Sequence, residues 1–332
     1  MTSFLTAAAT MQTLSLAAME EASRRGQRDA DLEHLFLALV ISDRAAGQAL
    51  RSAGITLDRA RDAVEALHAA QLESIGIAPG EPLAGPIVFH ETSGYEWTPR
   101  AMKVLQRAGR KRGGDASDVL RELLIEPSGL VDDLLQRLGT SRAEVSAALA
   151  DQDRPEAPSK PDPRWSRGAV VSRAEAFVPA DIEEVWALLA DPARMPEWNP
   201  AVGSVAARAN GDGLESTYGP TWWAFVRTHR PDGKELRVKE QYRRRLVTLV
   251  TVEQSRRIAW RTTFPDAKRA NAHLLEIELV PTVGGTQLQL VDSWTRRGGW
   301  RTIALWPLRP IQRFLTWVTL FQTAAGISRA FR

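Results

Sequence analysis

His273 and Asp292 are the two side chains of this sequence best suited to acid–base chemistry. They lie in stretches 272–280 and 286–296, whose alternating pattern predicts two strands, and strand parity allows both side chains to share one face. A histidine whose ring is oriented by a carboxylate is a common general base. The pair is therefore the candidate catalytic group. The alternative is that both are ordinary polar residues at the mouth of a pocket.

The register of the hairpin that joins these strands decides whether the two side chains meet. One register pairs Pro281 with Thr286. It places His273 diagonal to Asp292, where the two can touch. A two-residue glycine turn would instead pair Val283 with Thr286, and the two side chains would then lie about four residues apart along strands that rise roughly 3.3 Å per residue. The sequence leaves both registers open.

Other catalytic motifs are missing from the sequence. Its five histidines show neither HxH nor HExxH spacing and it has no cysteine, so we expect no metal site, no disulfide and no thiol nucleophile. The absence of GxxxxGK[ST] excludes an ATPase of the P-loop type, and GxSxG and GxGxxG are also absent. We expect no cofactor.

Three runs of arginine occur in the second half of the chain, at 243–245, 256–257 and 296–297. Such runs can contact phosphate or an anionic lipid. The alternative is that they are solvated outer faces of strands and turns. Nothing else in the sequence suggests a nucleic-acid partner, and none is expected.

Composition divides the chain into two modules. With 44% hydrophobic and 25% charged residues, the whole resembles globular domains and excludes a disordered or fibrous protein. Residues 1–151 carry a net charge of −5 and one of the 11 tryptophans, whereas residues 152–332 carry +8. Four prolines in 152–168 are typical of a stiff, extended linker. We therefore expect domains at 1–151 and 169–332.

Residues 1–151 contain two copies of a four-helix unit. Apolar residues in 32–40 have helical spacing, and a shift of 85 residues aligns Leu35 with Leu120 and Gly54 with Gly139 without a gap. Each glycine is placed to end a helix. The stretch from 74 to 97 is rich in proline and glycine, and is expected to be a loop.

The segment DLEHLFLALV at 31–40 and the tandem arrangement resemble the amino-terminal substrate-recognition repeat of Clp-type chaperone ATPases, over about 5–150. The resemblance implies a domain that contacts client proteins, adaptors or modified side chains, with Glu33, His34 and Asp118 as candidate protein-contact residues. The alternative for Glu33 and His34 is local, because an acidic residue favours the first turn of a helix and His34 can pack against its neighbour.

Residues 169–332 show an α+β pattern. Strands are predicted at 170–178, 202–208, 215–227, 235–241, 245–253, 258–264, 272–280 and 286–296, and helices after Asp181 and over 303–331. This order of one strand, short helices, a long antiparallel meander and a terminal helix allows the sheet to wrap around that helix.

Three segments carry a second resemblance: VPADIEEVWALLADPARMPEWNPAV at 178–202, RRIAWRTTF at 256–264 and ELVPTVGGTQLQL at 278–290. They resemble the START-like or SRPBCC superfamily, in particular its polyketide cyclase/dehydrase branch. The resemblance implies a helix-grip fold with a hydrophobic cavity between the sheet and the terminal helix.

Strand parity and helix spacing suggest which residues would line such a cavity. The candidate ligand-binding residues are Trp198, Trp222, Trp260, Phe264, His273, Leu275, Ile277, Leu290, Trp294, Phe314, Trp317 and Phe321. For each of them the alternative is ordinary core packing.

Our leading hypothesis is a cytoplasmic protein without ATPase activity that binds a hydrophobic small molecule or lipid in the second domain and a protein partner through residues 1–151. Two alternatives stay open. One is a cyclase- or dehydratase-like enzyme that orients a reactive polyketide chain, and the other is a regulatory adaptor of a chaperone–protease system. The first residues lack the pattern of a secretory signal, and prolines and arginines interrupt 302–325, so no transmembrane segment is expected.

Overall fold

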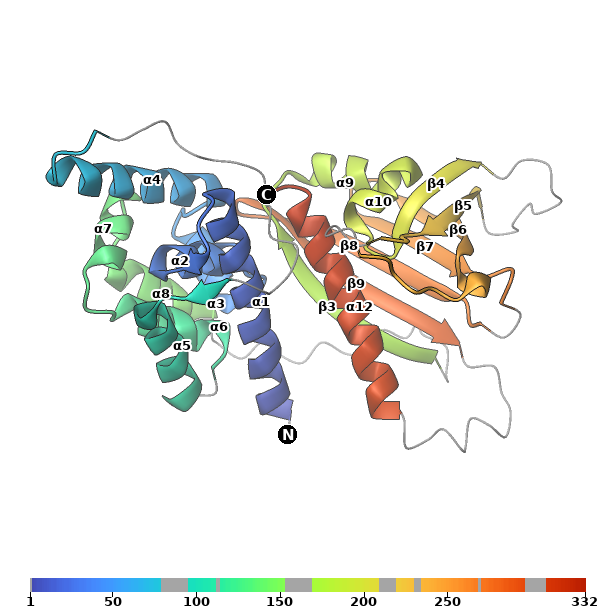
Figure 1. The fold of residues 1–332 in the computed structure, drawn as a ribbon, viewed down its shortest axis with the longest axis horizontal. Coiled ribbons are helices and arrows are strands. Elements are labelled where there is room, and N and C mark those ends of the chain that lie inside the picture. The colour runs from blue at the N-terminus through green and yellow to red at the C-terminus, as the bar shows by residue number, and fades with distance from the viewer. Residues whose placement is uncertain are drawn as a thin grey trace. The chain divides into compact units, whose positions relative to one another are not determined.

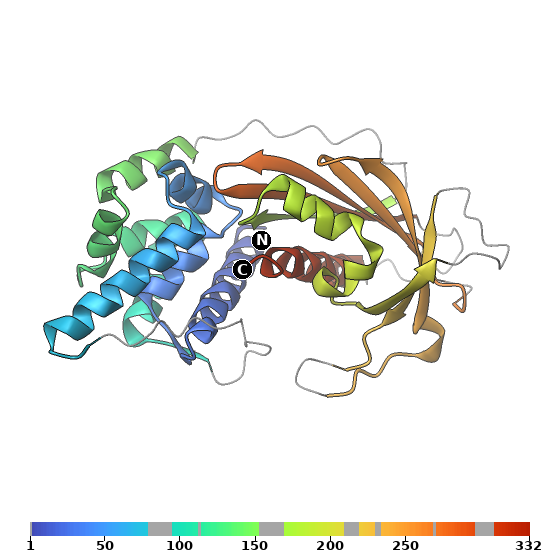
Figure 2. The ribbon, with the colours of Figure 1, turned by 90° about the horizontal axis from the view of Figure 1, so that it is seen from above.

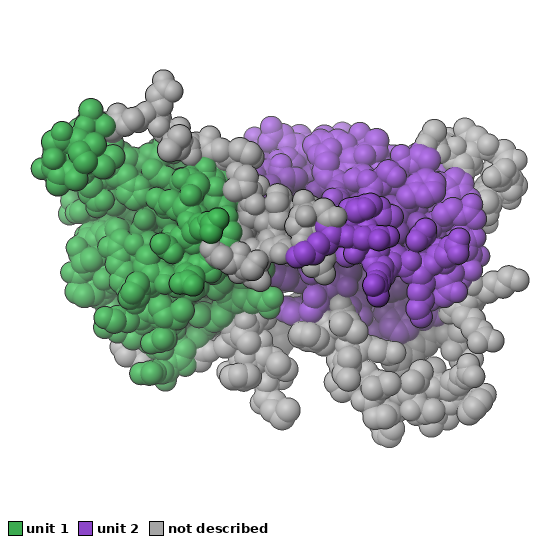
Figure 3. All heavy atoms as spheres, viewed as in Figure 1, with its two compact units in different colours: residues 1–157 green, residues 158–332 purple. Residues whose placement is uncertain are grey.

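The computed structural model describes residues 2–78, 95–111, 114–152, 169–208, 219–229, 234–267, 270–295 and 309–332. The chain folds as two compact units, residues 1–157 and residues 158–332 (Figures 1 and 3). We call them the helical unit and the grip unit.

The helical unit consists of two sets of four helices, as the repeat predicts. The first set is α1 (Thr2–Arg24), α2 (Leu32–Val40), α3 (Ala45–Ser52) and α4 (Leu57–Ser74). The second set is α5 (Pro99–Lys111), α6 (Ala116–Leu124), α7 (Leu130–Arg137) and α8 (Arg142–Gln152). Adding 85 to the first and last residue numbers of α3 gives the first and last residues of α7.

Gly54 and Gly139 follow α3 and α7 with φ of +78° and +74°. This left-handed conformation suits glycine at a helix end, so both predicted caps are confirmed. One detail of the predicted loop at 74–97 is wrong: β2 (Glu96–Trp97) ends it and pairs in parallel with β1 (Asp29–Ala30). Residues 79–94 lie outside the described residues.

The grip unit contains a seven-stranded antiparallel sheet and a terminal helix. In chain order its elements are β3 (Ala169–Val178), α9 (Ile182–Ala190), the 3-10 turn η1 (Pro192–Arg194), α10 (Met195–Trp198), β4 (Val202–Arg208), β5 (Thr221–Val226), the 3-10 turn η2 (Glu240–Tyr242), β6 (Arg244–Glu253), β7 (Arg257–Thr263), β8 (His273–Thr282), β9 (Gly285–Thr295) and α12 (Arg309–Arg329). The strand order is β3-β9-β8-β7-β6-β5-β4, so the first strand pairs with the last. The expected helix-grip arrangement is present.

The inner face of the sheet packs against α12, which the sheet curves around in Figure 2. Leu320, Ala324 and Ile327 of α12 join one buried cluster with Trp260 and Ile277 of the strands. This cluster is the core that positions the inner face.

Close packing of α12 against α10 depends on one glycine. A Cβ at Gly326 would lie 2.3 Å from the carbonyl oxygen of Trp198, closer than any side chain tolerates. Any larger residue would push the end of α12 away from α10.

One predicted strand is wrong. Residues 235–241 hold only a single bridge between His229 and Glu235 and the start of the η2 turn. The reason is that β5 pairs directly with β6, for example Trp222 with Val247, which leaves no place for a strand between them. The predicted strand at 215–227 is shorter than expected, with residues 209–218 outside the described part. The terminal helix is described from Arg309 onward.

Candidate functional site

The hairpin of β8 and β9 adopts the register that brings His273 and Asp292 together. Pro281 pairs with Thr286, and the turn consists of Val283 and the following glycine rather than two glycines. His273 Nδ1 lies 3.2 Å from Asp292 Oδ2. Because an ionised carboxylate only accepts, this contact assigns the proton to Nδ1 and leaves Nε2 free to accept one.

The His273 side chain is partly exposed and lies beside two aromatic rings. It is 39% exposed, whereas Asp292 is 14% exposed. The rings of Phe264 and Trp294 have centroids 6.4 Å and 6.1 Å from that of the imidazole. Tyr242 extends the group, with its ring 5.7 Å from Phe264.

Arg245 on β6 faces the same side of the sheet. It pairs with Ala224, a buried core residue of β5, and shares its strand parity with the buried Val247. Its guanidinium lies over the ring of Phe264, 5.5 Å from the centroid. Arg245 and the His273–Asp292 pair therefore border the same aromatic group from different strands.

The guanidinium of Arg245 has no polar partner among the described residues. Its Nε is buried without a hydrogen bond, and burial lowers the pKa of Arg245. Arg245 as a whole is partly exposed, and Nε is the guanidinium atom that is buried without a partner.

The structure divides the arginine run at 243–245. Arg243 and Arg244 are exposed, and Arg244 pairs with Asp266 at 2.9 Å. Arg245 alone turns inward. Sequence reasoning did not single it out, although the parity it shares with Val247 would have indicated the inner face.

The apolar candidates fall into two groups by burial. Trp198, Trp260, Ile277 and Leu290 are at most 2% exposed and belong to the core. The partly exposed group consists of Trp222, Phe264, Leu275, Trp294, Trp317 and Phe321. The side chain of Phe314 lies outside the described part of the structure.

The partly exposed group includes two ring contacts away from His273. Trp317 and Phe321 stack on α12, with centroids 5.6 Å apart and planes 19° apart. Trp222 tilts against the buried Trp260 at 5.9 Å. These half-buried rings are the ones that a ligand on the inner face could reach.

Glu33, His34 and Asp118 are buried within the helical unit, with 5%, 1% and 5% exposure. His34 Nδ1 accepts the backbone N–H of Asp31 at 3.1 Å, which caps α2. Asp118 accepts a hydrogen bond from Arg121 at 3.0 Å in the matching helix α6. A protein-contact role for the three stays a prediction.

Burial lowers the pKa of His34, so the ring is held neutral. Burial by itself raises the pKa of Glu33, but the hydrogen bond with His68 helps to hold that pKa below its usual value. His68 Nε2 lies 3.4 Å from the Glu33 carboxylate. Together they form a polar network inside the helical unit.

Comparison with family models identifies both halves of the chain. Residues 8–118 match the Clp repeat (R) N-terminal domain, and residues 169–316 match the family described as polyketide cyclase / dehydrase and lipid transport. The chain joins a Clp repeat domain to a polyketide cyclase/dehydrase-like domain. A search of curated proteins gave no match.

Solved structures similar to each half include the following. The N-terminal domain of ClpD from Arabidopsis thaliana is 22% identical, with 42% of this chain and 92% of that chain covered and a TM-score of 0.32. The di-domain ARO/CYC StfQ from the steffimycin biosynthetic pathway is 17% identical, with 62% and 60% covered and a TM-score of 0.34. TTHA0849 from Thermus thermophilus is 18% identical, with 48% and 97% covered and a TM-score of 0.34.

No group of three or more His, Asp or Glu side chains among the described residues is arranged to hold a metal ion. None of the helices in the described part of the chain combines the length and the apolar character needed to cross a membrane.

Proposed function

We propose that the grip unit binds a hydrophobic small molecule or lipid that carries an acidic or carbonyl oxygen, and that the helical unit contacts a protein partner. The observation that carries the ligand proposal is Arg245 on the inner face of the sheet, whose buried Nε has no hydrogen-bond partner among the described residues. An oxygen of the ligand would supply the acceptor that the described residues lack.

The aromatic side chains beside Arg245 support an apolar body for the same ligand. Phe264 contacts the guanidinium and also the ring of His273. A few polar groups placed among partly exposed aromatic rings are typical of small-molecule sites. The proposed ligand is therefore amphipathic, with its polar end at Arg245 and its apolar part along the inner face.

Native mass spectrometry of the full-length protein, followed by denaturing extraction, tests this proposal. We expect extra mass from a bound lipid or polyketide-like compound in the wild-type protein, and its loss in Arg245→Met. The matched control is Arg244→Met, which removes the same charge from an exposed neighbour. Equal retention in both variants, or no bound or rebinding compound in any of the three proteins, would contradict the proposal.

A second candidate function, an enzyme of the cyclase or dehydratase type, is favoured by the contact between His273 and Asp292. In this mechanism Nε2 of His273 accepts a proton from a carbon next to a carbonyl, Asp292 holds the ring, and Arg245 stabilises the resulting enolate oxygen. The carbanion would then attack a second carbonyl of the chain, and the imidazolium would return the proton.

Turnover of the extracted compound, followed by mass spectrometry, separates the two functions. Enzyme action predicts a rate lower by about a hundredfold in His273→Ala and a smaller loss in Asp292→Asn, while the compound still binds. A rate that does not change in His273→Ala would exclude this residue as the base and leave binding as the function of the unit.

A further inference from the structure

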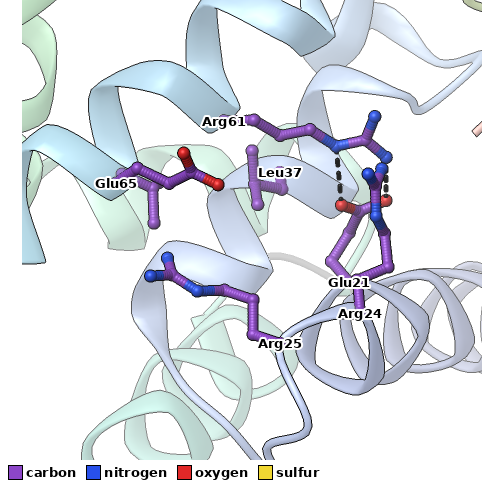
Figure 4. A pocket seen from close by; sticks show the side chains of 7 residues that line it. Glu21, Arg24, Arg25, Leu37, Arg61 and Glu65 are labelled. Carbon is purple, nitrogen blue, oxygen red and sulfur yellow. Dashed lines mark hydrogen bonds and ion pairs between the residues drawn. The ribbon is translucent and has the colours of Figure 1, made fainter. Parts of the chain in front are cut away.

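A hollow in the helical unit lies between α1, α2 and α4 (Figure 4). The space in it that water-sized groups can occupy is about 30 Å³. The side chains that line it are Glu21, Arg24, Arg25, Leu37, Arg61, Val64 and Glu65. We call it the arginine hollow, because three of these seven side chains are arginines.

One arginine of the hollow is already paired. Arg61 donates to both oxygens of Glu21, from Nε at 3.0 Å and from Nη2 at 2.8 Å. The Glu21 side chain is only 2% exposed, so this bidentate pair is part of the structure of the unit. Arg61 therefore supports the hollow rather than offering it free donors.

The other two arginines contribute donors without acceptors. Nη1 of Arg24 and Nη1 of Arg25 are both buried, and neither has a hydrogen-bond partner among the described residues. Burial first, and the neighbouring Arg61 second, lower the pKa of Arg24. A position at the end of α1 suits cations, but it does not supply an acceptor for these buried N–H groups.

We propose that the arginine hollow binds an oxyanion, a carboxylate or phosphoryl group, at Arg25. The guanidinium of Arg24 points to the Glu21–Arg61 pair, whereas that of Arg25 points to the other side of the hollow (Figure 4). A guanidinium group binds such anions by charge-assisted hydrogen bonds. The site goes beyond the ligand of the grip unit. It also suggests how the helical unit could recognise a protein partner, namely by an acidic or phosphorylated side chain of that partner. Free phosphate carries the same kind of oxyanion.

Glu65 limits the affinity of the hollow for anions. Its carboxylate lines the hollow across from Arg25, and no hydrogen bond or ion pair joins it to another described residue (Figure 4). A bound oxyanion would be repelled by this carboxylate. The proposal therefore predicts that removing the charge of Glu65 strengthens binding, whereas removing the charge of Arg25 weakens it.

The test uses the full-length protein and three labelled peptides of one sequence that carry serine, glutamate or phosphoserine at one position. Fluorescence anisotropy measures their binding, and inorganic phosphate serves as the free-anion probe by competition and by calorimetry. The variant is Arg25→Ala. Its matched control is Arg28→Ala, which removes the same charge from a nearby exposed residue outside the hollow.

We expect the affinity for an oxyanion probe to fall about tenfold or more in Arg25→Ala and to stay the same in Arg28→Ala. In Glu65→Gln the affinity should rise about two- to fivefold. Preference for the phosphoserine or glutamate peptide over free phosphate assigns the anion to a partner protein, and the reverse assigns it to a small molecule. No binding of any probe, or equal losses in Arg25→Ala and Arg28→Ala, would overturn the proposal.

Folding of the variants is monitored by hydrogen exchange of α1. Arg61 is left unchanged, because removing it would leave the buried carboxylate of Glu21 without its partner. Unchanged exchange in Arg25→Ala together with lost binding supports the site. If neither the hydrogen exchange of α1 nor the binding of the oxyanion changes in Arg25→Ala, then Arg25 does not bind the anion and the proposal is contradicted.

Discussion

The helical unit buries Arg51, the grip unit partly buries Arg245, and the two arginines have different surroundings. Arg51 on α3 is 2% exposed, and its Nη1 donates to the carbonyl oxygens of Val40 and Ser42 at 2.6 and 2.9 Å. Those carbonyls lie at the end of α2 and just beyond it, so Arg51 ties two helices together. Arg245 donates no hydrogen bond to any described residue. Backbone partners give Arg51 a role in holding the fold, whereas Arg245 lies over the ring of Phe264.

The largest expected effect is on the paired arginine. Arg51→Met leaves two buried carbonyls without their donor, which we expect to cost about 3 kcal/mol of the free energy of unfolding of the helical unit. Hydrogen exchange of α2 and α3 measures this loss locally. Gln136→Met is the control, because the 85-residue shift places the exposed Gln136 at the equivalent position. A loss below about 1 kcal/mol in Arg51→Met would remove the distinction between the two arginines.

The opposite result is expected for the unpaired arginine. Arg245→Met removes a partly buried charge that has no polar partner among the described residues, so the grip unit should unfold at the same urea concentration or a higher one, with a gain of up to about 1 kcal/mol. Tryptophan fluorescence follows this transition, since ten of the 11 tryptophans lie after residue 151. A marked loss of stability would mean that Arg245 serves the fold, as Arg51 does.

The smallest effect concerns the pH dependence of the helical unit. Burial lowers the pKa of His34 from its ordinary 6.5, so the unfolded chain binds a proton more readily than the folded one. The contribution of the neutral His34 to the stability of the helical unit is therefore fully present above about pH 6.5, and it is lost as the pH falls below that value. His34→Val, which copies Val119 of the second repeat, should flatten this dependence as measured by thermal unfolding. His229→Val in the grip unit should leave it in place.

Much of the site could be predicted from strand parity, and the part that could not depends on neighbours outside the hairpin. Parity put His273 and Asp292 on one face, but their register was undecided from residues 281–286 alone. The register depends on Gly285, where a Cβ would lie 2.1 Å from the carbonyl oxygen of Val178 on β3. No pattern within the hairpin reveals that close approach of a strand from the other end of the unit.

The arginine hollow shows a second limit of sequence reasoning. Arg25 follows α1 and Arg61 lies on α4, and the two line one hollow because both helices pack against α2. Helical spacing predicted each helix, and the repeat predicted their order. Neither carries information about which charged side chains remain without partners after packing, because that depends on distances between helices.

The pairing of β3 with β9 also governs the order in which the chain can fold during synthesis. Val178 pairs with Thr286 and Ala169 with Thr295, so the sheet cannot close until the last strand has been made. Contacts between such distant residues slow folding, whereas the helical unit depends on closer contacts and is complete earlier. During that interval β3 has an unpaired edge and the inner face is uncovered, so the grip unit is the part of this protein most exposed to aggregation before α12 packs.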